Sequence, residues 1–388
     1  MKSAPPRWGG ADSIVLCTCY YTNHLLTLIT MKIIQKKIVK PINDKIINNF
    51  PYYSFLLSDQ RYRYNGEINN TSRRVFILKE NGPILALLSY QIIKSRFGYH
   101  LKCLHTPAFS KHFFNLEANR QNQVIKYINN LIEKVATKNK CFLARLEYMI
   151  PKESKYKPLI KFIQTKSKDA PIQAVDATIT QQINISQSQD ILLSNMRSST
   201  RLNIKKLLKQ TDISVEISQD AKFLDYFFKF HNQTRLLKHY KEKPESVIRQ
   251  EIGCYLDKMV YFPVAFYRGE PIGVWICVQF GKYFANYLAA LDVNMRKQNM
   301  RASYLLFWES LLKAKNLGCE IFDLWGGMKP DDYNKRTKWD GINSFKRGFG
   351  GNTLHYMHIQ DIPITPKYFI YNIYSKHRTR KMGYYLDW

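Results

Sequence analysis

The chain has 388 residues, enough for two domains of ordinary size. Apolar residues make up 45% of the sequence and charged residues 23%, which is typical of a globular protein and excludes a disordered chain. The formal net charge at pH 7 is +29. A charge of this sign favours a polyanionic partner, such as nucleic acid, an anionic membrane or a phosphorylated substrate, although a lysine-rich surface without such a partner stays open.

The cysteines and histidines form no recognisable metal-ligand pattern. The seven cysteines are odd in number, include no Cys-x-x-Cys pair and lie mostly in apolar runs. They therefore indicate buried thiols in a reducing cytoplasm. The nine histidines show no His-Glu-x-x-His spacing, and no apolar run reaches the length of a membrane-spanning helix. The sequence predicts a cytoplasmic protein without metal, and it leaves a peripheral contact with the inner face of the membrane open.

Residues 1–30 differ in composition from the rest of the chain. They contain only one lysine and one arginine, and Asn23 and His24 interrupt their apolar segments. A secretory signal would have a cleaner apolar core and a small-residue cleavage site. We expect a disordered or spurious extension before Met31, with a degraded targeting segment as the alternative.

Residues 31–175 are expected to form a first mixed α/β domain. Residues 74–79 and 84–93 flank an Asn81-Gly82 pair, which predicts a β-hairpin. A strand is expected over residues 99–105, a helix with one apolar face over 119–138, and another strand over 141–149. Residues 151–175 are rich in lysine and proline and predict a connector with a short helix.

Residues 176–360 are expected to form a second domain. The predicted strands are residues 178–185, 261–267, 272–280, 284–291, 320–324 and 353–359, and the predicted helices are residues 190–210, 223–237, 245–257 and 300–315. The first of these helices carries a stripe of basic residues, which is either a functional surface or a solvated face. Residues 241–258 are short and include Pro244, so no long coiled-coil arm is expected.

The remaining segment, residues 361–388, is predicted to be a basic tail helix. Its tyrosine and lysine content suits either packing on the first domain, which we favour, or contact with an anionic membrane. The order of hairpin, strand, helix and strand occurs in both halves of the chain. The predicted fold class is therefore α/β (α+β), with two copies of one unit.

The repeated unit resembles the GNAT acyltransferase fold. That resemblance implies a strand-to-helix turn of the form R/Q-x-x-G-x-G/A, whose backbone N–H groups hold the pyrophosphate of acetyl-CoA. Arg296 and Ala302 match the two ends of this turn. Asn299, Met300 and Arg301 replace its glycines, and their side chains would crowd a pyrophosphate. The sequence therefore weakens the expectation of an acetyl-CoA donor.

A glycine-rich stretch near the C-terminus is the most distinctive motif. Residues 322–328 read FDLWGGM and residues 341–351 read GINSFKRGFGG. A strand that ends in glycines beside a fixed cation suits an anion or a developing oxyanion, although ordinary turn glycines are the alternative. Both segments resemble the C-terminal signature of the FemABX family, whose members are peptidyltransferases built from two tandem GNAT-like domains. The resemblance is most specific over residues 284–352.

The resemblance implies an aminoacyltransferase that forms peptidoglycan interpeptide bridges. It implies aminoacyl-tRNA as the donor, no bound cofactor, and UDP-MurNAc-pentapeptide or lipid II as the acceptor. Lys346 would stabilise the oxyanion, and Asp323 would either orient the acceptor amine or cap the strand end. Substrate contacts are assigned to Arg235, Tyr287, Arg63, Phe345, Arg347 and Arg296. The motif glycines would leave room for the stem peptide and the tRNA acceptor end to meet.

Two other functions remain open. A GNAT-type N-acyltransferase would use acyl-CoA or another acyl thioester on a sugar or lipid head group. A non-catalytic RNA- or membrane-binding module would keep the fold, and Lys346 would then be dispensable.

Overall fold

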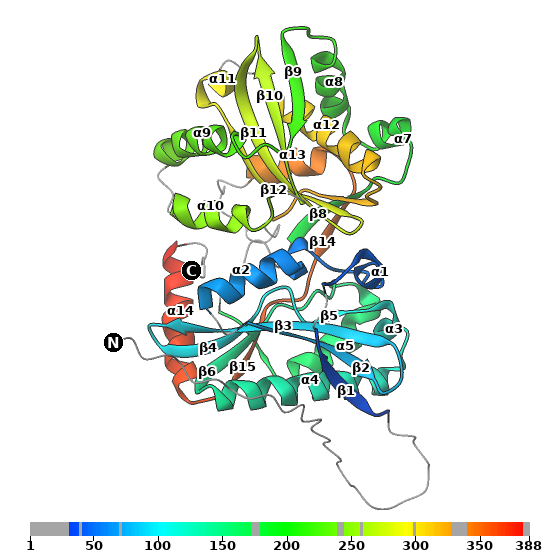
Figure 1. The fold of residues 1–388 in the computed structure, drawn as a ribbon, viewed down its shortest axis with the longest axis vertical. Coiled ribbons are helices and arrows are strands. Elements are labelled where there is room, and N and C mark those ends of the chain that lie inside the picture. Colours follow the sequence, from blue (N-terminus) through cyan, green and yellow to red (C-terminus); the bar gives the residue numbers. More distant parts are fainter. Residues whose placement is uncertain are drawn as a thin grey trace, which may run out of the picture.

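The computed structural model describes residues 31–38, 41–69, 72–171, 179–238, 244–256, 259–297, 300–326 and 340–382. Residues 1–30, for which we expected an extension, lie outside these ranges. Two α/β domains are stacked along the long axis of the molecule (Figure 1). Within the described ranges, no helix combines the length and the apolar character needed to cross a membrane.

The first domain is built on a mixed sheet with strand order β1-β2-β3-β4-β6-β15-β7, and β5 pairs with β3. Its strands are β1 (Ile33–Lys37), β2 (Arg73–Lys79), β3 (Ile84–Ser95), β4 (Gly98–Cys103), β5 (Ala108–Phe109), β6 (Cys141–Leu146), β7 (Lys168–Asp169) and β15 (Gln360–Pro363). Helix α4 (Ala118–Lys138) packs on this sheet through the predicted apolar face, which includes Val124, Ile128 and Ile132. Helix α5 (Lys157–Gln164) packs beside it.

The second domain has the strand order β14-β8-β13-β12-β11-β10-β9. Its strands are β8 (Ile179–Asn184), β9 (Ile213–Ser218), β10 (Val260–Tyr267), β11 (Glu270–Phe280), β12 (Tyr283–Leu291), β13 (Ile321–Asp323) and β14 (Asn352–His355). Helices α8 (Ser198–Leu207) and α12 (Ala302–Asn316) pack on one face of the sheet. Helices α9 (Phe223–Lys238) and α10 (Glu245–Gly253) pack on the other face (Figure 1).

The two sheets repeat one topology. The order β1-β2-β3-β4-β6 of the first matches β9-β10-β11-β12-β13 of the second. All of these pairs are antiparallel except the last of each set, β4 with β6 and β12 with β13, which are parallel. A parallel pair requires a crossover connection, and helices α4 and α12 supply it. The predicted tandem arrangement of two α/β units is confirmed.

The helix predicted over residues 190–210 is instead two helices, α7 (Gln189–Ser194) and α8. Arg201 explains the break, because its Nη1 donates to the carbonyls of Leu193, Ser194 and Met196 at 3.1–3.2 Å. These carbonyls lie at and just after the end of α7, so the Arg201 side chain acts as a cap. The prediction of one continuous helix over residues 190–210 is therefore wrong, and Arg201 of the predicted basic stripe binds these carbonyls.

The chain returns to the first domain at its C-terminal end. Strand β15 pairs with β6, and helix α14 (Lys367–Met382) lies against β6. Arg145 forms a bidentate ion pair with Asp361, with distances of 2.8 and 2.9 Å, and also donates to the hydroxyl of Tyr371 at 2.9 Å. This fully buried contact ties β6, β15 and α14 together.

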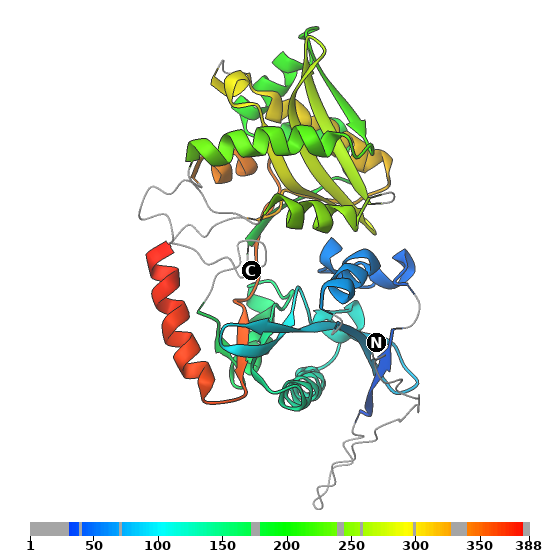
Figure 2. The ribbon, with the colours of Figure 1, turned by 60° about the vertical axis from the view of Figure 1, so that its left-hand side comes forward.

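The domains share one hydrophobic core. The segment containing helices α1 (Asp44–Ile47), η1 (Phe55–Leu57) and α2 (Asp59–Asn69) lies between the two sheets (Figures 1 and 2). Phe55 belongs to the same buried cluster as Phe227, Tyr255 and Trp325 of the second domain. The boundary is therefore packed like a domain interior, and side chains from both halves meet there.

Candidate functional site

Asp323 is fully buried at the end of β13. Its carboxylate accepts hydrogen bonds from the hydroxyls of Thr180 and Tyr283, from Gln182 Nε2 at 2.8 Å and from the Trp325 backbone N–H at 2.5 Å. Burial raises the pKa of Asp323, and the four donors act in the opposite direction. All four donors are groups of the second domain. Of the two roles predicted for Asp323, these contacts match the strand-end cap and not the orientation of an acceptor amine.

The backbone after Asp323 turns sharply. Trp325 has a φ of 49° and Gly326 a φ of 42°, both in the left-handed region. Lys346, from helix α13 (Asp340–Gly348), donates from Nζ to the carbonyl oxygen of Trp325 and, at 2.6 Å, to that of Gly326. The ammonium group of Lys346 is thus fixed at the end of β13. It contacts the carbonyl of Trp325, whose backbone N–H donates to Asp323.

The Trp325 side chain extends this turn into the domain boundary. Its ring centroid lies 4.8 Å from that of Phe55, 5.6 Å from that of His105 and 5.9 Å from that of Tyr287. Phe55 and His105 belong to the first domain and Tyr287 to the second. The turn that Lys346 supports is therefore in direct contact with both domains.

His105 is a buried residue of this cluster that the sequence did not reveal. Its Nδ1 lies 2.8 Å from Ser54 Oγ, and its backbone N–H donates to Glu147 Oε2 at 3.2 Å. Burial, with the positive charges of Arg61 and Lys102, lowers the pKa of His105 to about 3. The imidazole is therefore neutral at pH 7. An isolated histidine between a strand and a proline has no spacing signal that could have identified it.

An ion pair joins the domains next to Tyr287. Arg61 of α2 pairs with Glu251 of α10, and the Tyr287 hydroxyl donates to Glu251 Oε1 at 2.9 Å. The ladder pairs Ile276 with Leu288 but Cys277 with Asn286, so Tyr287 is the extra residue of a β-bulge. A bulge redirects the side chain that it contains. The sequence predicted a role for Tyr287 but not this partner, which belongs to a distant helix.

Three side-chain nitrogen atoms at the domain boundary have no hydrogen-bond partner within the described ranges. They are Nε of Arg61, Nε2 of His105 and Nε1 of Trp325, and all three are buried. Buried polar atoms are almost always paired, so unpaired ones mark a functional or strained region. The domain boundary therefore contains three buried nitrogen atoms whose hydrogen-bonding capacity the described residues leave unused.

The other predicted substrate contacts lie elsewhere. Phe345 packs against the rings of Tyr304 and Phe349 in the core of the second domain, at centroid distances of 5.3 and 4.7 Å. Arg347 is exposed on α13, next in sequence to Lys346. Arg63, on α2, is exposed as well. The Arg296 side chain lies outside what the structure describes.

Arg235 lines a pocket on the second domain. The pocket has a volume of about 370 Å³ and is formed by α9 and the start of α10. Its lining residues are Phe228, His231, Asn232, Arg235, Pro244, Glu245 and Ile248. The exposed guanidinium of Arg235 can contact an anionic group there.

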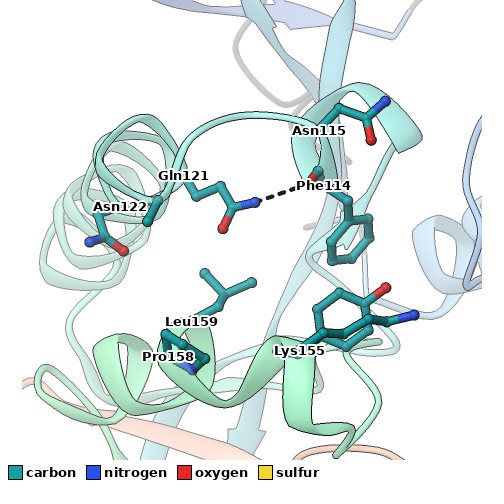
Figure 3. Close-up of a pocket in the computed structure, with 9 residues that line it drawn as sticks. Phe114, Asn115, Gln121, Asn122, Lys155, Pro158 and Leu159 are labelled. Atoms are coloured by element: carbon teal, nitrogen blue, oxygen red, sulfur yellow. Dashed lines mark hydrogen bonds between the residues drawn. The ribbon is translucent and has the colours of Figure 1, made fainter.

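A second pocket, of about 400 Å³, lies on the first domain between the start of α4 and α5 (Figure 3). The Gln121 side chain points toward Phe114 and donates to its carbonyl at 3.2 Å. None of the predicted site residues lines this pocket. It is therefore separate from the chemistry around Lys346.

The last three glycines of the signature, Gly348, Gly350 and Gly351, lie against other parts of the second domain. A Cβ at Gly348 would lie 2.6 Å from Thr200 Oγ1, one at Gly350 2.7 Å from the Asn195 carbonyl oxygen, and one at Gly351 2.2 Å from that of Gln182. These neighbours all belong to the second domain. The prediction that these glycines leave room for substrate chains is wrong for these three positions, because the fold itself occupies the space.

The described ranges contain no group of three or more histidine, cysteine or carboxylate side chains that could hold a metal ion. Their five cysteines, Cys103, Cys141, Cys254, Cys277 and Cys319, are free thiols.

Residues 194–335 match the family model of the acetyltransferase (GNAT) domain. The match begins at the end of α7 and includes the sheet from β9 to β13. The chain therefore contains a domain of the GNAT acyltransferase class.

One solved structure shares the fold of most of the chain. A crystal structure of FemX is 11% identical, covers 86% of this chain and 97% of its own, and superposes with a TM-score of 0.69. The chain thus has the tandem GNAT fold of the FemABX type, as predicted from its signature. L-PGS from Bacillus licheniformis, at 12% identity, covers 88% of this chain and 98% of its own with a TM-score of 0.47. A tandem GNAT protein from the clavulanic acid biosynthesis pathway, at 8% identity, covers 76% and 83% with a TM-score of 0.47. No curated protein sequence matches the chain.

Proposed function

We propose that this protein is a peptidyltransferase that moves an amino acid from aminoacyl-tRNA to the stem-peptide side-chain amine of a peptidoglycan precursor. The observation that carries the proposal is the position of Lys346. The signature motif assigns this lysine to the oxyanion, and its Nζ is held by two backbone carbonyls at the end of β13, next to the domain boundary. The tandem fold shared with FemX supports the same function.

The chemistry needs a fixed positive charge more than a nucleophile on the protein. The acceptor amine attacks the ester carbonyl of aminoacyl-tRNA, a C–N bond forms, and the C–O bond to the ribose breaks. The amine loses one proton, and the departing ribose oxygen gains one. Negative charge develops on the carbonyl oxygen of the tetrahedral intermediate, where a preorganised cation is most effective. Lys346 supplies that cation, because its two carbonyl contacts fix its position before the substrate binds.

The turn before α12 supports a donor without coenzyme A. Arg301 stands at the N-cap of α12, and its guanidinium donates to Asn203 Oδ1 at 2.9 Å. The N-terminus of this helix is where a GNAT pyrophosphate would contact backbone N–H groups. A large side chain anchored at that position disfavours the pyrophosphate. We therefore infer that the enzyme uses no cofactor and takes its acyl group from aminoacyl-tRNA.

Arginine side chains would supply contacts for the anionic substrates. We assign phosphate binding to Arg235 beside its pocket, with Arg63, Arg347 and Arg296 as further contacts to UDP-MurNAc-pentapeptide or lipid II. Tyr287 would contact the sugar-peptide portion. Planar guanidinium groups suit phosphate because they form two parallel hydrogen bonds to its oxygens.

A direct test incubates the protein with a mixture of charged tRNAs and UDP-MurNAc-pentapeptide and follows the mass of the muropeptide. We expect a mass increase of one amino-acid residue. Acylation with acyl-CoA, and none with any charged tRNA or with a lipid-linked acceptor, would instead establish a thioester-dependent N-acyltransferase.

The Lys346→Met variant tests the oxyanion role. We expect kcat to fall about a hundredfold or more, because removing one oxyanion donor has this effect in other enzymes. Lys134→Met, which removes a charge from the exposed face of α4, is the matched control and should keep full activity. Thermal unfolding of both variants separates a loss of chemistry from a loss of fold. Unchanged turnover in folded Lys346→Met would refute the assignment.

A further inference from the structure

Helix α14 has two apolar faces, and the residues that the structure describes cover only one of them. Tyr368, Tyr371 and Ser375 are buried against the first domain. Phe369, Ile370 and Ile373 point outward and are 52%, 66% and 73% exposed. Their spacing places them on one side of the helix. We call these three residues the outer face of α14.

The helix is held so that this face stays outward. Tyr371 accepts a hydrogen bond from Arg145 at 2.9 Å, and the Tyr371 ring packs on those of Phe97 and Phe142 at 5.5 and 5.3 Å. In both ribbon views α14 runs along the outside of the first domain (Figures 1 and 2). Rotating the helix to bury the outer face would break these inner contacts.

Positive charge surrounds the outer face. The α14 sequence contains no Asp or Glu, and the lysines and arginines whose side chains the structure describes there are Lys367, Lys376 and Arg378. Neighbouring elements add two further cations. Lys168 Nζ of β7 lies 4.9 Å from the centre of the Phe369 ring. The guanidinium of Arg96 lies 4.9 Å from the centre of the Tyr374 ring, and its Nη1 donates to the Tyr374 hydroxyl at 2.8 Å.

We propose that the outer face of α14 docks on an anionic lipid bilayer, with the helix axis parallel to the membrane plane. Apolar side chains at the centre of the patch would enter the boundary between headgroups and acyl chains, and the surrounding lysines and arginines would contact anionic headgroups. An RNA partner would use the cations but would leave Ile370 and Ile373 without an apolar contact. This surface is independent of the acyl-transfer chemistry.

Vesicle co-sedimentation tests the proposal without any donor or acceptor substrate. The full-length protein is mixed with vesicles of phosphatidylcholine alone and of phosphatidylcholine with phosphatidylglycerol. We expect binding to the anionic vesicles only, and weaker binding as salt increases. The double variant Ile370→Glu/Ile373→Glu should bind at least about tenfold more weakly, because it removes two exposed apolar side chains that would enter the bilayer. Lys376→Gln, which leaves the apolar residues intact, should lose about fivefold.

Leu202→Glu on α8 is the matched control, since Leu202 is 68% exposed on another helix. It should bind like the unaltered protein. Equal binding to neutral and anionic vesicles, or unchanged binding of the double variant, would overturn the proposal. So would a dimer in solution that the double variant converts to a monomer, or binding to tRNA that replaces vesicle binding, because either result would assign the face to another partner. Circular dichroism confirms that each variant is folded.

Discussion

Acidification should weaken the boundary between the two domains through His105. The imidazole is 2% exposed, stacks on Trp325 across the boundary, and contacts Ser54 Oγ. Protonation would place a third positive charge near those of Arg61 and Lys102, which already lower the pKa of His105. The folded protein is therefore more stable with a neutral His105 imidazole than with a protonated one.

The sign and size of the effect follow from the two pKa values. The pKa is about 3 in the folded protein and about 6.5 in the unfolded chain. Between these values the unfolded chain binds more protons, so the free energy of unfolding falls as the pH decreases below 6.5. The slope is about 1.4 kcal/mol per pH unit, which gives a loss of roughly 2–3 kcal/mol at a pH of about 4.5. Above 6.5 this contribution is fully present and constant.

Urea unfolding of the protein and of His105→Asn over this pH range measures the effect. Asparagine suits the site because it tolerates the positive φ of 49° and offers a side-chain amide toward Ser54. Other groups titrate equally in both proteins, so the difference between the two pH profiles isolates His105. His112→Asn, at an exposed position, should keep the steep dependence. Parallel profiles for the protein and His105→Asn would refute the reasoning.

Three further substitutions probe the packing. Arg145→Met should reduce the free energy of unfolding by about 3–5 kcal/mol in urea, because it removes the bidentate partner of the buried Asp361 carboxylate, whereas adding Asp361→Leu should restore much of the loss. Gly351→Ala should lower the free energy of unfolding by roughly 3 kcal/mol or more, because Gly351 has a φ of 75° and a Cβ there would lie 2.2 Å from the Gln182 carbonyl oxygen. Gly341→Ala is the control, since the space around Gly341 is open, and it should leave thermal unfolding unchanged. Tyr287→Phe should reduce the free energy of unfolding by about 1.5 kcal/mol by removing its hydrogen bond to a buried carboxylate, and an unchanged urea midpoint would contradict this.

Local patterns in the sequence were sufficient to predict most of the fold. The apolar spacing of residues 119–138 predicted α4, and the Asn-Gly pair predicted the hairpin of β2 and β3. Both signals depend on residues close together in sequence. The two repeats could be recognised because each reproduces the same order of such signals. The break between α7 and α8 was missed, because the capping action of Arg201 is not visible in helical periodicity.

The residues at the domain boundary could not be predicted in the same way. Arg61 and Glu251 are separated by 190 positions in the chain, and nothing near either residue indicates the other. His105 and Trp325 meet only because two separate domains pack together. Contacts of this kind depend on the tertiary arrangement, which the sequence of either segment alone does not specify.

In the signature motif, the residue type alone was not sufficient to predict what each glycine contacts. Glycine admits a close neighbour whether that neighbour is a substrate or the protein's own backbone, so the sequence could not distinguish the two. The structure places the carbonyl oxygens of Gln182 and Asn195 against Gly351 and Gly350, so these glycines let the chain between α13 and β14 pack closely on the backbone of the second domain. Lysine is different, because its charge must face a specific acceptor. Lys346 lies on α13, the helix directly before these glycines, and reaches the carbonyls at the end of β13. The glycines would then contribute to catalysis indirectly, by setting the position of the lysine, and Gly351→Ala should reduce turnover even at temperatures where the variant remains folded.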